Sequence, residues 1–262
     1  MNKTIEQSVA QAMDASTVEI LPFLPYILQD FWEIGASPSD ISHLVRKHVP
    51  AGRAFKVLDL GCGKGAVSVK LAAEFGCFCT GIDAVGEFIN YAGAKAAEYG
   101  VSGLCDFRVD DIRTAVEDFK GYDVIVLGAI GPVFGNAFET LEKVKGCLAA
   151  DGVVLIDDAY YEDGAERDDT GIAYRSELLD QIGRAGMELA DEKLADGNES
   201  RSDSFGIEFG HIVRRCSELA DKFPDKKCIF EEYVETQRAE YDSIMNDLTC
   251  STLVIKLRHP AL

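Results

Sequence analysis

Hydrophobic and polar positions divide the chain into segments of two kinds. From about residue 55, short apolar runs alternate with segments in which apolar residues recur at helical spacing. The apolar runs predict strands at 55–60, 77–82, 104–109, 123–127 and 152–156. The segments between and after them predict helices at 66–76, 87–99, 138–148 and 175–185. Apolar strands that alternate with helices favour a parallel sheet with helices on both faces.

The two ends of the chain are mainly helical in pattern. Residues 4–50 predict helices broken at Pro22 and Pro25, and Ser37 is expected to cap a helix that begins at Pro38. After a strand at 187–194, the polar stretch 196–203 is expected to be a loop. Helices at 205–222 and 229–248 and a strand at 251–257 are predicted to follow. We therefore expect a helical cover at 1–50 and one domain at 51–262 that carries a helical insertion at about 197–249.

A glycine-rich loop follows the first predicted strand, in the stretch VLDLGCGKG at 57–65. A buried strand, a turn without side chains and a helix N-terminus together form a nucleotide cradle. Gly61, Gly63 and Ala66 fit the dinucleotide fingerprint, which alone is a weak signal. Asp59, two residues before the first glycine, disfavours a pyrophosphate because like charges repel. It suits a ligand with a cationic amino group, such as S-adenosylmethionine, which Asp59 would contact through its backbone or a water.

These motifs resemble those of the class I S-adenosylmethionine-dependent methyltransferases, particularly the small-molecule type that includes ubiquinone- and menaquinone-biosynthesis-like enzymes. The glycine stretch matches the first motif of that family, and Asp83, which ends the second strand, matches the acid that binds the ribose hydroxyls. Asp111, with Asp110 as the adjacent alternative, matches the acid that faces the adenine amino group, and Ile112 the residue that packs on the ring. The resemblance covers roughly 32–194.

The resemblance implies an α/β fold: a Rossmann-like, doubly wound sheet of seven strands, mostly parallel, with an antiparallel last strand at the sheet edge. It also places the helical insertion where such enzymes often build a substrate lid. The cofactor-binding residues predicted in this way are Asp59, Gly61, Cys62, Gly63, Gly65, Asp83, Ala84, Asp111, Ile112, Gly128 and Trp32. Trp32 is alternatively a core residue, as lone tryptophans often are.

Composition limits the partners and the location. The formal net charge of −19 disfavours nucleic acid, whose phosphates need cations, although short basic pairs occur at 46–47 and 214–215. No apolar run approaches the ~20 residues of a membrane span, and the N-terminus lacks a signal-peptide pattern. We expect a cytoplasmic protein with its eight cysteines reduced. The cysteines and the four histidines, His43, His48, His211 and His259, show no zinc-ligand spacing, so no metal is expected.

The acceptor of the methyl group is less clear from the sequence. Asp158, Tyr160 and His211 are candidates for a base or a substrate contact, although each also has a structural interpretation. The acidic segment at 162–169 is either solvated or attracts a cationic substrate; a magnesium site is disfavoured because no acid ends the fourth strand. We expect a small-molecule acceptor and a possible homodimer. The alternatives are a nicotinamide-dependent oxidoreductase and a cofactor-binding sensor without transferase activity.

Overall fold

The computed structural model describes residues 3–167, 171–195 and 198–258, without the side chains of 198–204. The chain forms two compact units. The sheet unit comprises Glu33–Ala195 and Cys250–Leu262, and the helical unit comprises Met1–Trp32 and Asp196–Thr249. These units differ from the expected division at residue 50, because the segment from Glu33 onward belongs to the sheet unit. The proposed roles of cover and lid stay predictions.

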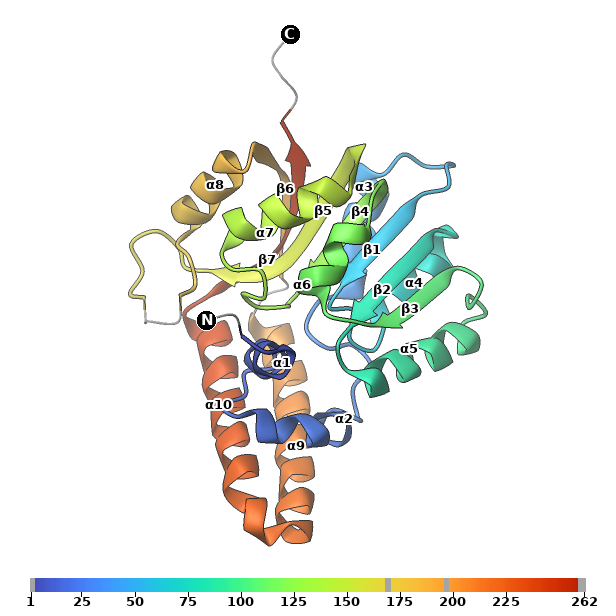
Figure 1. Ribbon diagram of the computed structural model, residues 1–262. Coiled ribbons are helices and arrows are strands. Elements are labelled where there is room, and N and C mark those ends of the chain that lie inside the picture. Colours follow the sequence, from blue (N-terminus) through green and yellow to red (C-terminus); the bar gives the residue numbers. More distant parts are fainter. Residues whose placement is uncertain (1–2, 168–170, 196–197, 259–262) are drawn as a thin grey trace. The chain divides into compact units, whose positions relative to one another are not determined.

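The sheet unit contains a seven-stranded sheet in the order β3-β2-β1-β4-β5-β7-β6 (Figure 1). Strands β1 to β4 pair in parallel and β4 pairs in parallel with β5, whereas β6 and β7 pair antiparallel. The strands are β1 Lys56–Leu60, β2 Phe78–Asp83, β3 Cys105–Val109, β4 Tyr122–Gly128, β5 Leu148–Tyr160, β6 Met187–Leu194 and β7 Thr249–Leu257. This confirms the Rossmann-like fold. One detail was wrong: β7 lies between β5 and β6, so β6 forms the edge.

Helices cover both faces of this sheet (Figure 1). On one face lie α3 Pro38–His48, α4 Ala66–Phe75 and α5 Gly86–Glu98. On the other lie α6 Ile112–Ala115, α7 Ala137–Val144 and α8 Arg175–Arg184, with the 3₁₀ turns η2 Val116–Asp118 and η3 Lys145–Cys147. A buried cluster that includes Leu58, Ile125 and Val154 joins the sheet to this second layer. The predicted cap of α3 is confirmed, since the Ser37 hydroxyl accepts a 3.3 Å hydrogen bond from the Asp40 amide.

The helical unit is built on two long helices that lie side by side, α9 Asn198–Lys222 and α10 Lys227–Asn246 (Figure 1). The 3₁₀ turn η4, Pro224–Lys226, joins them, while α1 Ile5–Ala12, η1 Val18–Phe23 and α2 Leu24–Ile27 pack beside them. The loop expected at 196–203 was wrong from residue 198 onward, because α9 already begins at Asn198. Residues 196–197 lie outside the described residues. Polarity alone does not exclude a helix where one face remains exposed to solvent.

Candidate functional site

The glycine loop joins β1 to α4 at the carboxyl edge of the sheet. Gly61, Gly63 and Gly65 have φ angles of 76°, 51° and 72°, which residues with a Cβ rarely adopt. The Gly61 and Cys62 amides donate hydrogen bonds of 2.8 and 3.0 Å to the Ile82 carbonyl, so the loop lies against the end of β2. The alternating glycines thus let the chain turn sharply and bring the N-terminus of α4 to this edge.

Asp83, the last residue of β2, binds backbone amides of the loop and of its own turn. Its carboxylate accepts hydrogen bonds from the Gly63 amide (2.9 Å) and the Val85 amide (2.8 Å), and the Ala84 amide also contributes. Burial raises the pKa of the Asp83 carboxyl, and these three donors oppose that rise. The residue is half-buried, and a carboxylate offers about four acceptor positions. It therefore retains capacity to accept from a ligand.

Asp59 of β1 pairs with Gly81, two residues before Asp83 in β2, and is buried, with 3% of its surface exposed. Its carboxylate accepts a 2.7 Å hydrogen bond from the Ser68 hydroxyl of α4. Burial and then the charge of Asp83 raise the pKa of Asp59 to about 6. A paired cation would lower these pKa values, so the two carboxyls form a site whose electrostatics favour a positive ligand. The burial of Asp59 agrees with the expectation that it acts without direct side-chain contact.

The glycines in and beside the loop allow other side chains to pack closely against the backbone. A Cβ at Gly81 would lie 2.6 Å from the Phe107 ring and 2.9 Å from the Cys62 sulfur, and a Cβ at Gly65 would lie 2.9 Å from the same ring. A Cβ at Gly61 would lie 2.6 Å from the Ile130 side chain. These glycines are required by the packing of the chain on itself. At Gly63 nothing lies within 4 Å of such a Cβ, so this glycine faces open space.

The segment Glu33–Ser37 crosses the ends of β4 and β5, which the sequence did not predict. A Cβ at Gly128 would lie 2.6 Å from the Ala36 Cβ, and a Cβ at Gly35 would lie 2.7 Å from the Ala129 Cβ. The Ser37 amide donates a 3.1 Å hydrogen bond to Asp157, whose pKa burial raises to about 6. Gly128, a predicted cofactor residue, is therefore covered by this segment. Only the small residues at 35–36 and 128–129 could have indicated this close approach.

The third predicted motif, at residues 110–112, has side-chain partners that differ from those of Asp83. The Asp111 carboxylate forms a bidentate ion pair with the Arg113 guanidinium, with distances of 2.7–3.0 Å, and also accepts from the Arg113 amide. This pairing lowers the pKa of Asp111. Asp110 is exposed and accepts a 2.8 Å hydrogen bond from the Asp111 amide. Ile112 is only 7% exposed and belongs to the core cluster beneath α6.

The two catalytic candidates of the sheet unit, Asp158 and Tyr160, differ in solvent exposure and in hydrogen-bond partners. Asp158 is an exposed residue, but burial of its carboxyl group raises the pKa of that group. Its carboxylate accepts a 2.8 Å hydrogen bond from the Ala159 amide, which opposes the rise. Tyr160 is buried, and its hydroxyl donates a 2.7 Å hydrogen bond to Glu192, which also pairs with Arg175. Burial and Glu192 raise the pKa of Tyr160 to about 12, which makes it a poor base near neutral pH. Of these two, Asp158 is the better candidate for contact with a substrate.

Trp32 and His211 belong to the helical unit, so their predicted roles at the cofactor or the substrate stay predictions. The His211 ring nitrogen Nδ1 lies 3.2 Å from the Asp30 carboxylate and 3.3 Å from the Arg214 guanidinium. Asp30 also forms a bidentate pair with Arg215. The predicted basic pair at 214–215 is thus bound to acidic side chains of its own unit.

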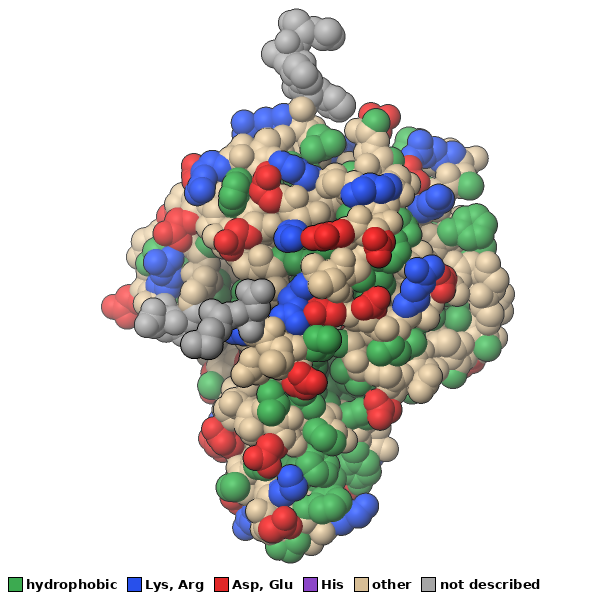
Figure 2. Space-filling model, viewed as in Figure 1, with side chains coloured by type: hydrophobic (Ala, Val, Ile, Leu, Met, Phe, Trp, Pro, Cys, Tyr) green, Lys and Arg blue, Asp and Glu red, His purple; other side chains and the backbone are tan. Residues whose placement is uncertain are grey.

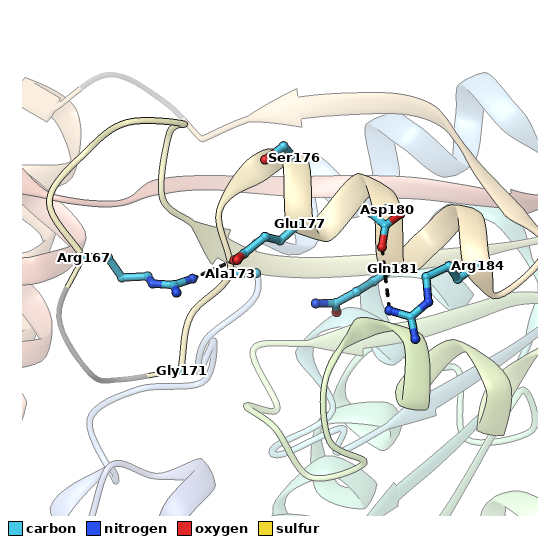
Figure 3. Close-up of a pocket in the computed structure, with 8 residues that line it drawn as sticks. All are labelled: Arg167, Gly171, Ala173, Ser176, Glu177, Asp180, Gln181 and Arg184. Carbon is cyan, nitrogen blue, oxygen red and sulfur yellow. Dashed lines mark hydrogen bonds and ion pairs between the residues drawn. The ribbon is translucent and has the colours of Figure 1, made fainter.

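A cavity of about 450 Å³ lies between the segment after β5 and α8 (Figure 3), and no residue of the glycine loop lines it. Among the described residues, the charged side chains that line this cavity pair with one another: Arg167 with Glu177, and Arg184 with Asp180. Asp163 accepts hydrogen bonds from the amide and hydroxyl of Ser176, so one acid of the predicted acidic segment stabilises the start of α8. Asp168 and Asp169 lie outside the described residues. Attraction of a cationic substrate by the acidic segment stays a prediction.

The residues in and beside the glycine loop have the properties that S-adenosylmethionine requires of a binding site. Gly63 faces open space, Asp83 retains acceptor capacity for a diol, and the raised pKa values of Asp59 and Asp83 favour a ligand with positive charge. Among the described residues, no group of three or more His, Cys, Asp or Glu side chains is arranged to hold a metal ion. All eight cysteines are free thiols.

Comparison with known proteins agrees with this geometry. Residues 52–200 match the family model described as a methyltransferase domain, which is more than half of the chain. The chain belongs to this methyltransferase family. It is an S-adenosylmethionine-dependent enzyme of class I, as the motifs predicted, and this decides against the nicotinamide alternative. No curated protein matches the sequence.

Solved structures with the same fold include a methyltransferase from Geobacter sulfurreducens in complex with S-adenosyl-L-homocysteine. It is 21% identical, with a TM-score of 0.75 over 90% of this chain and 98% of that one. A methyltransferase from Thiobacillus denitrificans, also with S-adenosyl-L-homocysteine, is 18% identical, with a TM-score of 0.74 over 90% and 98%. YjhP from E. coli is 18% identical, with a TM-score of 0.73 over 89% and 100%. At these identities the likeness concerns the fold.

Proposed function

We propose that this enzyme holds S-adenosylmethionine at the glycine loop and transfers its methyl group to a small molecule. The observation that carries the proposal is the pair of carboxyls at the ends of β1 and β2. Asp59 pairs with Gly81, two residues before Asp83 on the same face of the sheet, and the charge of Asp83 acts on Asp59. The two carboxylates together stabilise an incoming cation and repel an incoming pyrophosphate. A methyl donor with a sulfonium and an α-amino group meets this requirement, whereas a dinucleotide does not.

Each part of the site has a proposed role. Asp83 accepts hydrogen bonds from the ribose hydroxyls, since its carboxylate is already oriented by the Gly63 and Val85 amides. Gly63, with its open face, lets the backbone approach the ligand, and Asp59 supplies negative charge from beneath the loop. The remaining proposed contacts are Gly61, Cys62, Gly65, Ala84, Gly128, Ile112 and either Asp110 or Asp111.

When bound, the cofactor supplies an activated methyl group that is open to direct displacement by a nucleophile. The chain then has to align the acceptor, exclude water and, for some acceptors, hold a proton. We propose Asp158 for the proton, because the residue is accessible from solvent and burial of its carboxyl raises the pKa of that group. His211 stays a second candidate, while Tyr160 is bound to Glu192.

The charge distribution supports a small acceptor in place of a nucleic acid. On the face that Figure 2 shows, acidic and basic side chains alternate over the sheet unit, and the net charge is −19. Arg46 pairs with Glu74 and Lys47 with Asp191, so this predicted basic pair is also neutralised.

The free thiols fit a reducing compartment, and we keep the cytoplasm as the proposed location. No described helix has the length and apolarity to cross a bilayer. A homodimer stays a prediction.

Calorimetry with S-adenosylhomocysteine, and with NADH as the comparison ligand, tests the cofactor site. We expect saturable binding of the first ligand and none of the second. A methyl-transfer screen with amines, phenols, thiols, carboxylates and an oligonucleotide then tests the acceptor. Methylation of only the oligonucleotide would contradict a small-molecule acceptor. Tight cofactor binding without any methylated product would instead support the non-catalytic alternative.

A further inference from the structure

Three cysteine side chains gather on one face of the sheet, at β2 and β3. Cys79 of β2 and Cys105 of β3 are register partners in neighbouring parallel strands. Cys77 precedes β2, and its sulfur lies 3.7 Å from that of Cys79. Residues two apart in a strand share a face, so the next layer toward the loop contains Gly81 and its register partner Phe107. The thiols of Cys79 and Cys105 therefore lie one layer beneath the Phe107 ring, which packs against Gly81 and Gly65.

The three thiols differ in their access to solvent. Cys77 and Cys79 are buried, at 1% and 2% exposure, whereas Cys105 lies on the outermost strand and is half-buried. A hydrogen bond from the Cys79 thiol lowers the pKa of Cys105, and hydrogen bonds with Cys105 and Cys77 raise the pKa of Cys79. Cys105 is thus the accessible member with the greater thiolate character, the property that governs oxidation by peroxides.

The strand geometry suits a covalent bond between Cys79 and Cys105. Neighbouring strands lie about 4.8 Å apart, and the Cα atoms of a disulfide lie about 4.4–6.8 Å apart, so register partners on one face are within range. Cys77 lies just before β2, two residues from Cys79, and residues two apart in an extended chain have Cα atoms about 6.6 Å apart, near the upper limit. Cys105 is therefore the favoured partner of Cys79, although Cys77 also lies close.

We propose that Cys79 and Cys105 are a peroxide-sensitive thiol pair that closes to a disulfide between β2 and β3, one layer beneath the Phe107 ring. In the first step the Cys105 thiolate attacks hydrogen peroxide, the O–O bond breaks, and Cys105 becomes a sulfenic acid as hydroxide leaves and takes up a proton to form water. The Cys79 sulfur then attacks the Cys105 sulfur, the S–O bond breaks, and water leaves with the Cys79 proton. Two thiols are oxidised by two electrons, and one peroxide is reduced to two waters.

The disulfide would act on the cofactor site through Phe107. Drawing the two sulfurs to bonding distance moves β3 against β2 at the layer directly below that ring. The ring fills the space above Gly81 and Gly65, where even a methyl group would lie within 3 Å of it, so it has little room to shift without moving the loop. This consequence rests on the proposed cofactor site, whereas disulfide formation does not.

The experiment uses the full chain with Cys228→Ser, which removes the exposed thiol of α10 and so prevents links between molecules. The reduced protein is treated with hydrogen peroxide, denatured, and analysed by thiol titration and tandem mass spectrometry. We expect the loss of two thiols per chain and a Cys79–Cys105 link that dithiothreitol reverses. Cys105→Ser should abolish the link, and Cys77→Ser should leave it intact. A link to Cys77, or sulfinic acid without any disulfide, would overturn the pair.

Binding of S-adenosylhomocysteine is measured on the same samples. We expect about tenfold weaker binding after oxidation, recovery with dithiothreitol, and no oxidation effect in Cys105→Ser. Cys105→Ala is a second variant if the serine lowers the melting temperature. A disulfide that leaves the affinity unchanged would overturn the coupling to the cofactor site. If the reduced protein does not bind S-adenosylhomocysteine, the proposed cofactor site fails, and thiol mapping still decides whether the disulfide forms.

Discussion

The ends of β2 and β3 each present an aspartate to the same edge of the sheet, but the two have different partners. Asp83 is held by backbone amides, and its pKa is raised by burial. Asp111 is held by a guanidinium two residues away, and its pKa is lowered. A carboxylate on neutral donors keeps its charge available to a ligand, whereas one paired with arginine is largely neutralised. Equivalent positions in a motif therefore need not contribute equally to binding.

The largest effect is expected from Asp83→Ala. It removes the proposed acceptor of two ribose hydroxyls and also frees the Gly63 amide that orients the loop. Hydrogen bonds to charged groups contribute about 1.5–3 kcal/mol each, so S-adenosylhomocysteine should bind at least ~100-fold more weakly by calorimetry. Asp106→Ala is the matched control, because Asp106 is an exposed aspartate on β3 that pairs with Arg108. Equal losses in both variants would show that the effect is not specific to the site.

The next effect concerns pH and Asp59. Its folded pKa of about 6 lies above the usual value of 3.8, so the folded state binds the proton more tightly than the unfolded state. The resulting stabilisation is complete below pH ~4 and is lost as the pH rises through ~6, by up to about 3 kcal/mol. In Asp59→Asn, the free energy of unfolding should therefore fall less between pH 4 and 7.5 than in the wild-type protein. Denaturant unfolding at several pH values, with Asp106→Asn as control, measures this difference.

Two glycines separate packing from ligand access. Gly81→Ala places a methyl group 2.6 Å from Phe107, and such overpacking costs about 1–3 kcal/mol of stability. Gly63→Ala meets nothing within 4 Å and should cost only about 1–2 kcal/mol for its positive φ. Its methyl group enters the space proposed for the cofactor, so binding of S-adenosylhomocysteine should weaken about tenfold. Thermal unfolding and calorimetry on both variants test this, and unchanged affinity in Gly63→Ala would remove Gly63 from the site.

Local sequence signals were enough to predict the part of the site that β1, the glycine loop and α4 form. The strand, the glycine loop and α4 follow one another in sequence, and the cap at Ser37 depends on residues within three positions. The helix was predicted at 87–99, but α5 ends at Glu98 and Tyr99 is 43% exposed. Helical spacing loses its meaning at a helix end, where the backbone leaves the helical path.

Contacts between distant segments were not predictable in the same way. The crossing of residues 35–36 over 128–129, and the insertion of β7 between β5 and β6, depend on how the whole sheet assembles. The ion pair between Asp111 and Arg113 is local in sequence, but it was not predicted, because the family motif assigns a role only to the aspartate. A cation two residues after a motif acid is a signal that sequence reasoning can use, because it predicts a neutralised carboxylate.

The smallest effect is therefore expected at Asp111. Asp111→Ala removes the N-cap of α6, which costs about 1 kcal/mol of stability, but the carboxylate was already engaged by Arg113. S-adenosylhomocysteine should bind within about threefold of the wild-type affinity. Arg113→Ala is the informative partner, since it frees the carboxylate without removing it, and binding should stay the same or strengthen. A loss in Asp111→Ala as large as that in Asp83→Ala would mean that ligand binding displaces Arg113 and that the two strand ends act alike.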